Sequence, residues 1–265
     1  MKLRSLGYRT DLMVRGQETA VEDRGDLLLV RTPSNPDFRW GNFLLFGGPP
    51  AAGDLPRWTA LFRQNLPGCR HYAFGWEGGA GQVGEFLANG FRLILSDVLV
   101  RAAGPAPARE LPVGLRLKPF RRRDWRAWAE VELLEERERP EGEREELTSF
   151  ARYTEQRCAE RQELIRSGRA QWWGAFLGEQ LVSSAGLVWE GKLGRFQHVA
   201  THPDYRRRGF CRALLSGVLG SEEALALEQL VIVADPHYHA AALYLQLGFV
   251  PAEQQYGLER TKQLP

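Results

Sequence analysis

The stretch that decides the fold is FQHVATHPDYRRRGFCRALLSGV, which spans Phe196–Val218. Its first residues are compatible with a β-strand, and we expect this strand to end at Thr201. The polar turn HPDY and three arginines follow, and Gly209 then leads into an apolar helix. The sequence therefore predicts a strand–turn–helix unit with a strongly basic turn.

The beginning of such a helix is suited to bind a diphosphate. The first turn of a helix has backbone N–H groups without helical partners and carries a partial positive charge. Arginines beside it add charge-assisted hydrogen bonds. A glycine at position 209 lets the backbone approach the phosphates without a Cβ in the way. We therefore expect an anion to bind where the turn meets the helix.

This segment resembles the acetyl-CoA-binding motif of the GNAT superfamily of N-acetyltransferases. That motif reads Gln/Arg-x-x-Gly-x-Gly/Ala after a strand. Arg206 stands at its first position and Gly209 at its central glycine, while Cys211 stands where glycine or alanine is usual. Because cysteine is small, we expect a slightly tighter loop there.

A second segment, AALYLQLGFVPA (Ala241–Ala252), resembles the last helix and strand of the same family. Tyr244 stands at the position of the family's tyrosine, and His237 replaces the asparagine usually found seven residues before it. Two motifs in the right order are far more specific than either alone. The resemblance covers roughly Leu111–Pro265 and implies a mixed α/β, GNAT-like acyltransferase fold.

The resemblance also implies a reaction, in which an acetyl group passes from acetyl-CoA directly to a primary amine in a ternary complex. The backbone of Val199, Ala200 and Thr201 would bind the pantetheine like an added strand and support the oxyanion. Tyr244 would protonate the departing thiolate. The pyrophosphate would lie on the basic turn and the start of the helix, at Arg206, Arg207, Arg208, Gly209, Phe210, Cys211 and Arg212.

The base that takes the proton of the amine is not assigned by the sequence. An amine with a pKa of about 10.4 arrives protonated, so a base or a water chain is needed. His198 titrates in a suitable range, but strict alternation along the strand places it opposite Val199 and favours a buried structural role. Glu190 and the acidic run Glu135–Glu146 are other candidates, although such a run is more often a solvated loop.

The segment AAGPAPARELP (Ala102–Pro112) is rich in Ala, Pro and Gly and has no apolar period, so it predicts a linker. We place the boundary between two domains there, at residues 1–110 and 111–265. The second domain has the predicted element order βααβββαβαβ, which is a mixed α/β arrangement.

The first domain is predicted to be a degenerate copy of the second. Leu6–Val14 and Asp26–Thr32 are interpreted as strands, and the order β-β-β-α-β-α-β matches the second domain without its first strand and two helices. EFLANGF (Glu85–Phe91) aligns with LYLQLGF (Leu243–Phe249), which places Phe86 at the position of the tyrosine. The loop before the first helix of this domain, GGPPAAGDLPRW (Gly47–Trp58), lacks an arginine-rich glycine turn. We infer a tandem protein with one intact and one degenerate copy.

The composition and charge limit the classes of partner molecule that we expect. A net charge of +2 gives no reason to expect a nucleic acid or a membrane surface. No apolar run approaches the roughly 20 residues of a membrane span, and the N-terminus has no apolar signal-peptide core. The cysteines, Cys69, Cys158 and Cys211, are odd in number and form no CxxC pair, which favours the cytoplasm.

We therefore expect a cytoplasmic enzyme with a small-molecule or peptide amine as acceptor, and we leave a homodimer open. His237 and His239 have no third ligand at metal-site spacing, so we expect no metal. A non-catalytic acyl-CoA-binding or regulatory module is the alternative. A third hypothesis rests on Gly79-x-Gly81-x-x-Gly84, a nucleotide-binding pattern that lacks the acidic residue about 20 positions on.

Overall fold

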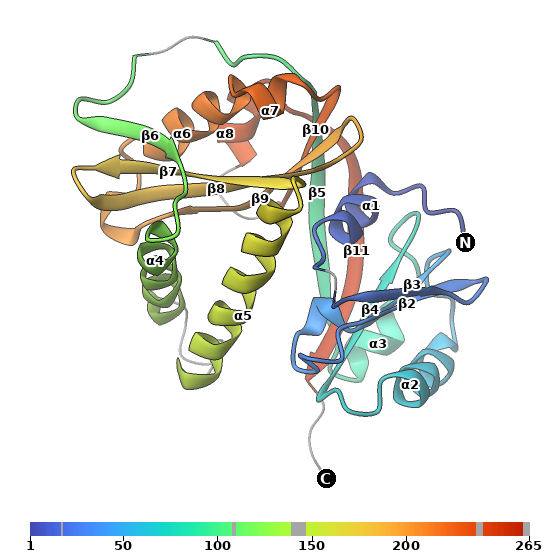
Figure 1. Cartoon of the computed structure of the whole chain (residues 1–265). Coiled ribbons are helices and arrows are strands. Elements are labelled where there is room, and N and C mark those ends of the chain that lie inside the picture. The colour runs from blue at the N-terminus through green and yellow to red at the C-terminus, as the bar shows by residue number, and fades with distance from the viewer. Residues whose placement is uncertain (17, 108–109, 139–146, 237–240, 262–265) are drawn as a thin grey trace. The chain divides into compact units, whose positions relative to one another are not determined.

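The computed structural model describes residues 1–16, 18–107, 110–138, 147–236 and 241–261. Its packing divides the chain into two compact units (Figure 1). Unit 1 comprises Met1–Val98, Val233–Tyr238 and Pro251–Pro265. Unit 2 comprises Leu99–Ile232 and His239–Val250. The end of the chain thus belongs to unit 1, and the domain boundary after residue 110 stays a prediction.

Unit 2 is built on a sheet with the strand order β10-β9-β8-β7-β6. Strands β6 to β9 pair antiparallel, whereas β10 pairs parallel with β9. The strands are β6 (Leu115–Pro119), β7 (Ala170–Leu177), β8 (Gln180–Glu190), β9 (Leu193–Thr201) and β10 (Gln229–Ala234).

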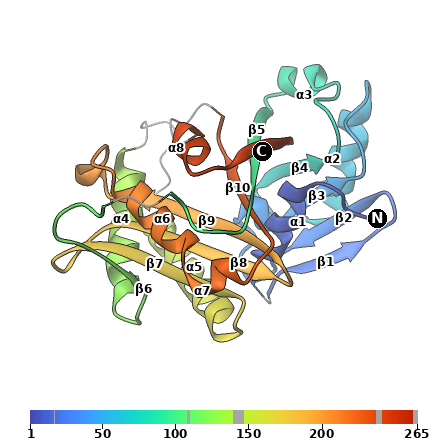
Figure 2. The same ribbon diagram turned by 90° about the horizontal axis from the view of Figure 1, so that it is seen from above.

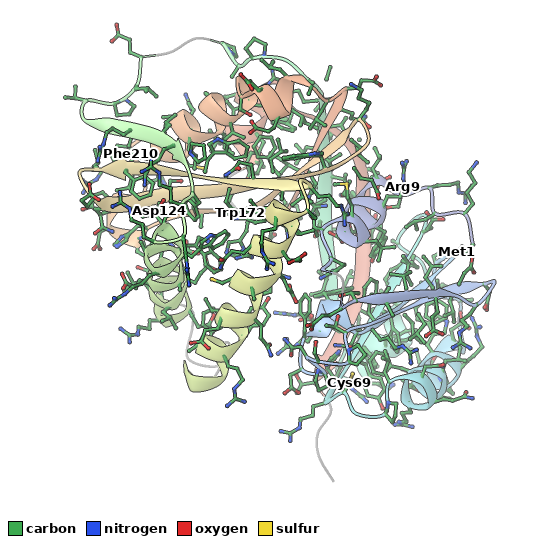
Figure 3. The ribbon with its side chains drawn as sticks, viewed as in Figure 1. Met1, Arg9, Cys69, Asp124, Trp172 and Phe210 are labelled. Carbon is green, nitrogen blue, oxygen red and sulfur yellow. The ribbon has the colours of Figure 1, made fainter. Side chains whose placement is uncertain are left out.

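Helices cover both faces of this sheet. The long helices α4 (Asp124–Glu138) and α5 (Leu147–Arg166) lie on one face, and α6 (Phe210–Leu219) and α7 (Glu222–Leu225) lie on the other (Figures 1 and 2). Figure 3 shows Trp172 of β7 on the α4–α5 side, where it packs against Trp125 with ring centroids 5.8 Å apart. With α8 (Ala241–Gln246) and the final strand, the predicted element order βααβββαβαβ is confirmed apart from the short additional helix α7 between α6 and β10.

Unit 1 contains a sheet with the order β1-β2-β3-β4-β11-β5. Its helices α2 and α3 pack on one face around Trp58, Phe62 and Phe86, and α1 packs on the other through Tyr8. The elements are α1 (Leu6–Met13), β1 (Ala20–Asp23), β2 (Leu27–Arg31), β3 (Phe43–Phe46), α2 (Asp54–Asn65), β4 (His71–Trp76), α3 (Gly84–Ala88), β5 (Arg92–Ala102) and β11 (Val250–Thr261). A short 3-10 turn, η1, spans Arg39–Gly41.

The interpretation of Leu6–Val14 as a strand is wrong, because this segment forms helix α1. Ser5 caps the helix by accepting the backbone N–H of Tyr8. The Thr10 hydroxyl donates to the Leu6 carbonyl at 2.8 Å, so the polar group of this β-branched residue is hydrogen-bonded within the helix. The first strand is β1, further along the chain, so the order from there to β5 is still β-β-β-α-β-α-β.

The predicted internal repeat is visible in the backbone of two helix ends. Helix α3 is followed by Gly90 with φ 78°, and the Phe91 N–H donates to the Phe86 carbonyl at 3.0 Å. Helix α8 ends in the same way: Gly248 has φ 86°, and the Phe249 N–H donates to the Tyr244 carbonyl at 3.1 Å. A left-handed glycine closes both helices, which is the usual C-terminal cap.

Candidate active site

Strands β9 and β10 pair over only part of their length. Their parallel register runs from Gln229↔Leu193 to Val231↔Arg195, whereas β9 continues to Thr201. Among the described residues, no strand pairs with the far end of β9 on the side of β10. A parallel strand that diverges in this way leaves backbone groups without a strand partner, where an extended ligand can pair. At Thr201 itself, the carbonyl accepts Arg206 Nε and the backbone N–H donates to Glu135. Val199, Ala200 and Thr201, the predicted pantetheine residues, lie in this segment.

The basic turn leads from β9 into α6 through two left-handed residues, Arg207 with φ 65° and Gly209 with φ 80°. Gly209 occupies the N-cap of α6 and has no side chain to cap the helix. In the described part of the chain, the backbone N–H groups from Arg207 to Arg212 have no protein acceptor, whereas the Arg212 side chain donates to Gln246. The turn therefore presents a series of donors at the positive end of a helix.

The space above Gly209 fits a diphosphate. A Cβ placed on Gly209 would meet no atom within 4 Å, so the surface over the turn is open. Arg207, Arg208 and Gly209 are all exposed, and a bound phosphate would receive N–H groups without displacing protein atoms. Phe210, labelled in Figure 3, is buried at 7% exposure and would contribute through its backbone N–H alone.

Arg206 contacts carboxylates instead of projecting freely from the turn. Its Nη2 lies 3.1 Å from Glu135 Oε1, its Nη1 lies 2.6 Å from Glu138 Oε2, and its Nε donates to the Thr201 carbonyl at 3.3 Å. Partial burial acts to lower the pKa of Arg206, but these two carboxylates outweigh it and the pKa is raised. This arginine fixes the turn against α4, and the phosphate contacts would come from its backbone and from its neighbours.

The acidic run Glu135–Glu146 is not entirely a solvated loop, as the sequence had suggested. Helix α4 continues to Glu138, Glu136 is only 2% exposed, and Glu135 and Glu138 bind Arg206. Residues 139–146 lie outside the described residues, as do His237 and His239. In the described ranges, no group of three or more His, Cys, Asp or Glu side chains is arranged to hold a metal ion.

Cys211 faces the end of β9. Burial raises the pKa of its thiol to about 11, although hydrogen bonds with the hydroxyls of Thr201 and Ser183 act to lower it. Ser183 itself donates to the Ala200 carbonyl at 2.7 Å. The substitution of a small residue by cysteine is therefore accommodated by a polar contact between the helix and the strand. A thiol with this pKa is protonated at neutral pH and is a poor nucleophile.

Tyr244, the predicted acid, lies on α8 and is 7% exposed. Its ring contacts Phe249, and Phe249 in turn contacts Phe196 of β9, with centroids 6.5 Å and 6.0 Å apart. The aromatic series Tyr244–Phe249–Phe196 therefore joins the second motif to the strand that carries the first. The structure brings together the two motifs that the sequence identified separately.

His198 lies at an irregular position of β9. It has φ 54° in the middle of β9, and its Nε2 lies 2.5 Å from Glu132 Oε2 on α4. Its ring also meets Trp128 edge-on, at 5.3 Å between centroids. The positive φ belongs to a bulge that no sequence signal marks, because bulges outside glycine positions depend on the partner strand.

In unit 1, the parallel pair β3–β4 corresponds to β9–β10 of unit 2, but it has no unpaired end. Strands β3 and β4 stay paired to their last residues, Phe46↔Trp76, and the Glu77 N–H donates to the Phe46 carbonyl at 3.1 Å. Gly53, with φ 83°, caps α2 as Gly209 caps α6. However, its N–H donates to Glu85 Oε2 at 3.2 Å. Carboxylates thus stand where an intact copy would bind a phosphate.

Two further features of this closed copy agree with the sequence. Asp54 Oδ2 accepts the Ala51 N–H at 2.9 Å, which adds a second carboxylate to the loop. Phe86, aligned with Tyr244, is fully buried and has no hydroxyl. Gly81 of the nucleotide-like pattern has φ 68°, and an added Cβ would lie 2.5 Å from Pro50 Cδ. Packing against the prolines accounts for this glycine.

Residues 138–259 match the family model of the acetyltransferase (GNAT) domain. Within this segment the chain matches a GNAT acetyltransferase domain. A mycothiol acetyltransferase from Thermobispora bispora is 28% identical over 193 residues, which are 66% of this chain and 61% of that protein. The chain therefore spans less than two thirds of the length of this curated relative.

Two solved structures share the fold over nearly the whole length of this chain. A GCN5-related N-acetyltransferase from Kribbella flavida has a TM-score of 0.64 at 12% identity, and the match covers 98% of both chains. A tandem GNAT protein from the clavulanic acid biosynthesis pathway has a TM-score of 0.53 at 16% identity, with 94% of this chain and 85% of that chain covered. The tandem GNAT arrangement inferred from the sequence is thus confirmed as a fold.

Proposed function

We propose that this protein transfers an acetyl group from acetyl-CoA to the primary amine of a small molecule. One observation carries the proposal: the unpaired end of β9 leads directly into the open, donor-rich turn that begins α6. An extended arm with a diphosphate behind it has the shape of this surface, because the strand offers backbone pairing and the helix offers positive charge. Acetyl-CoA supplies the activated acetyl group as co-substrate.

The residues of the turn would act through their backbones. The backbone N–H groups of Arg207, Arg208, Gly209, Phe210, Cys211 and Arg212 would donate to the phosphates, and the exposed side chains of Arg207 and Arg208 would add charge. Arg206 would hold the turn in place through Glu135 and Glu138. On β9, Val199, Ala200 and Thr201 would pair with the pantetheine, and one N–H of this segment would stabilise the oxyanion.

Tyr244 would donate a proton to the sulfur of the departing CoA. It comes from α8, which follows β10, and its ring contacts Phe249, which in turn contacts Phe196 of β9. Cys211 is the cysteine nearest the turn, and its raised pKa of about 11 disfavours a covalent acyl-enzyme. Direct attack of the amine on the thioester is therefore the mechanism that the site supports best.

The acceptor is proposed to be a small amine. The curated relative is named for mycothiol, so amines related to mycothiol belong in any panel, beside amino sugars and lysine. Among the described helices none has both the length and the apolar character needed to cross a membrane. Cytoplasmic location and a homodimer stay predictions.

Incubation of the full chain with acetyl-CoA and a panel of primary amines tests this function. We expect the release of CoA, followed with a thiol reagent, together with an acetylated amine identified by mass spectrometry. Binding of acetyl-CoA without turnover on any amine would instead support the non-catalytic acyl-CoA-binding module.

A further inference from the structure

His198 lies at a break in the regular pairing of β8 and β9. Ser184 pairs with Ala200, but Gly186 pairs with Gln197, so β9 has one residue more than β8 between these points. The extra residue is accommodated with His198 in a left-handed conformation, φ 54°, which is unfavourable for a side chain other than glycine. Bulges of this kind redirect side chains and are frequent beside active sites.

The redirected imidazole meets a carboxylate on helix α4. His198 Nε2 and Glu132 Oε2 are 2.5 Å apart, and Trp128 packs edge-on against the ring. The His198 side chain is 31% exposed, whereas that of Glu132 is 9% exposed. One ring nitrogen is therefore held by a buried carboxylate, while the ring keeps an accessible side. This is the arrangement of a base oriented by a third group.

The charges around this pair come from two helices and keep the imidazole neutral. Burial lowers the pKa of His198, Glu132 opposes this effect, and Arg161 and Arg157 of α5 add to the lowering. Burial acts to raise the pKa of Glu132, but His198 and the two arginines outweigh it and the pKa is lowered.

Two more titratable groups stand near the carboxylate, Glu135 on α4 and Cys158 on α5. Neither appears among the groups that shift the pKa of His198. At neutral pH the imidazole is thus free to accept a proton beside an ionised carboxylate.

We propose that His198 is the general base that takes the proton of the attacking amine, and that Glu132 is the residue that positions it. This inference rests on the proposed acetyl transfer. His198 adjoins Val199 on the strand proposed to bind the thioester arm, and its ring lies toward α4 and α5 instead of toward α6. The amine would reach the thioester from the α4–α5 face of the sheet.

The amine first loses its ammonium proton to solvent, because only the neutral form has a lone pair for attack. The lone pair of the neutral amine forms the new N–C bond at the thioester carbonyl, and one N–H proton passes to His198. The C–S bond then breaks, its electron pair goes to sulfur, and Tyr244 supplies the proton of the free thiol. Once bonded to the carbonyl carbon, the positively charged nitrogen is far more acidic than a free ammonium group, so an imidazole can accept its proton. Water returns the proton of His198 to solvent and reprotonates Tyr244.

The other candidate bases are less suitable. Glu190 is exposed and pairs with Leu193 at the β8–β9 hairpin, at the opposite end of β9 from Thr201. Glu135 is bound to Arg206. His202 is a structural histidine, because its Nδ1 accepts the Asp204 N–H at 3.3 Å.

The test uses His198→Gly in the full chain, because glycine tolerates the left-handed backbone at this bulge. We expect kcat to fall about 10²- to 10³-fold, as for loss of a general base, with the Kd of acetyl-CoA unchanged by calorimetry. Added imidazole should restore part of the rate. The acid limb of the kcat/KM profile, which reports a pKa below about 6.5 in the wild type, should disappear.

Glu132→Gln tests the positioning role. Glu132 raises the pKa of His198, so its loss should move the acid limb to lower pH and reduce kcat about tenfold. The matched control is Glu130→Gln on the same helix, whose side chain is 62% exposed and pairs only with Arg126 in the described structure; it should leave the profile unchanged.

The outcomes separate the two proposals. Wild-type turnover with an unchanged pH profile in His198→Gly, and no rescue by imidazole, would overturn the dyad and leave the acetyltransferase intact. Failure of the wild type to bind acetyl-CoA or to acetylate any amine would overturn the proposed function and the dyad with it.

Discussion

Replacing Gly209 with alanine should weaken acetyl-CoA binding more than it destabilises the fold. The residue has φ 80°, so a Cβ would add backbone strain of about 1–2 kcal/mol. For a chain of this size we expect a fall in Tm of about 2–8 °C. The new Cβ would also occupy the open space over the turn. Loss of one hydrogen bond to a charged phosphate, about 1.5–3 kcal/mol, corresponds to a Kd about 10- to 100-fold higher.

Gly53→Ala is the matched control. Gly53 has φ 83°, caps α2 as Gly209 caps α6, and likewise has open space around an added Cβ. It should cost a similar amount of stability and leave the Kd of acetyl-CoA unchanged. Scanning fluorimetry gives the two Tm values, and calorimetry gives the two Kd values. Equal Kd values for Gly209→Ala and the wild type would refute the assignment of the turn as the phosphate site.

Three other predictions concern the acid, one helix cap and the division of the chain. Tyr244→Phe should lower kcat about 10²-fold without changing the Kd of acetyl-CoA; unchanged kcat in stopped-flow and steady-state assays would exclude the acid role. Burial acts to raise the pKa of Asp124, but hydrogen bonds from Lys118 and the Arg121 N–H outweigh it and the pKa is lowered. The stability that ionised Asp124 contributes is therefore present above about pH 4 and is lost as the pH falls. Asp124→Ala should reduce the free energy of unfolding by about 1–2 kcal/mol at pH 7 and by much less at about pH 2.5, measured in urea titrations. An equal loss at both pH values would contradict this. Because β11 pairs with β4 from Tyr256↔Trp76 to Thr261↔His71, co-expressed fragments 1–106 and 107–265 should co-purify. Fragment 107–250, which lacks most of β11, should capture less of 1–106, and equal capture by the two fragments would contradict this.

The sequence predicts the second copy well because its information is local. A basic turn before an apolar helix and a tyrosine before a glycine-capped helix end are recognisable within short segments. The structure places both around β9, and the order of elements follows the prediction. The similarity between the helix ends at Phe86 and Tyr244 could be found for the same reason, because it lies within one short segment of each copy.

The features that the sequence does not reveal depend on contacts between distant segments. Helix α1 is fixed by the Ser5 cap and by a buried tyrosine, although its residues suit a strand equally well. Strand β11 belongs to unit 1 because it pairs with β4, far away in the chain. The His198 bulge depends on the pairing of β9 with β8, and the partner of its imidazole, Glu132, lies on helix α4, so the residues around His198 do not reveal either feature.

The degenerate character of the first copy also has a physical cause that composition alone did not show. The sequence analysis noted missing arginines and a missing hydroxyl. The structure adds a carboxylate, Glu85, on the N–H of the capping Gly53, and a β3–β4 pair that stays closed to its end. Negative charge at a helix N-terminus stabilises the helix and excludes a phosphate from the same place.

The central claim is that one copy binds acetyl-CoA and the other is closed. Calorimetric titration of acetyl-CoA into the full chain tests it most directly. We predict one site per chain, lost or weakened in Gly209→Ala and unchanged in Gly53→Ala. Two sites per chain, or a single site that responds to Gly53→Ala and not to Gly209→Ala, would contradict it.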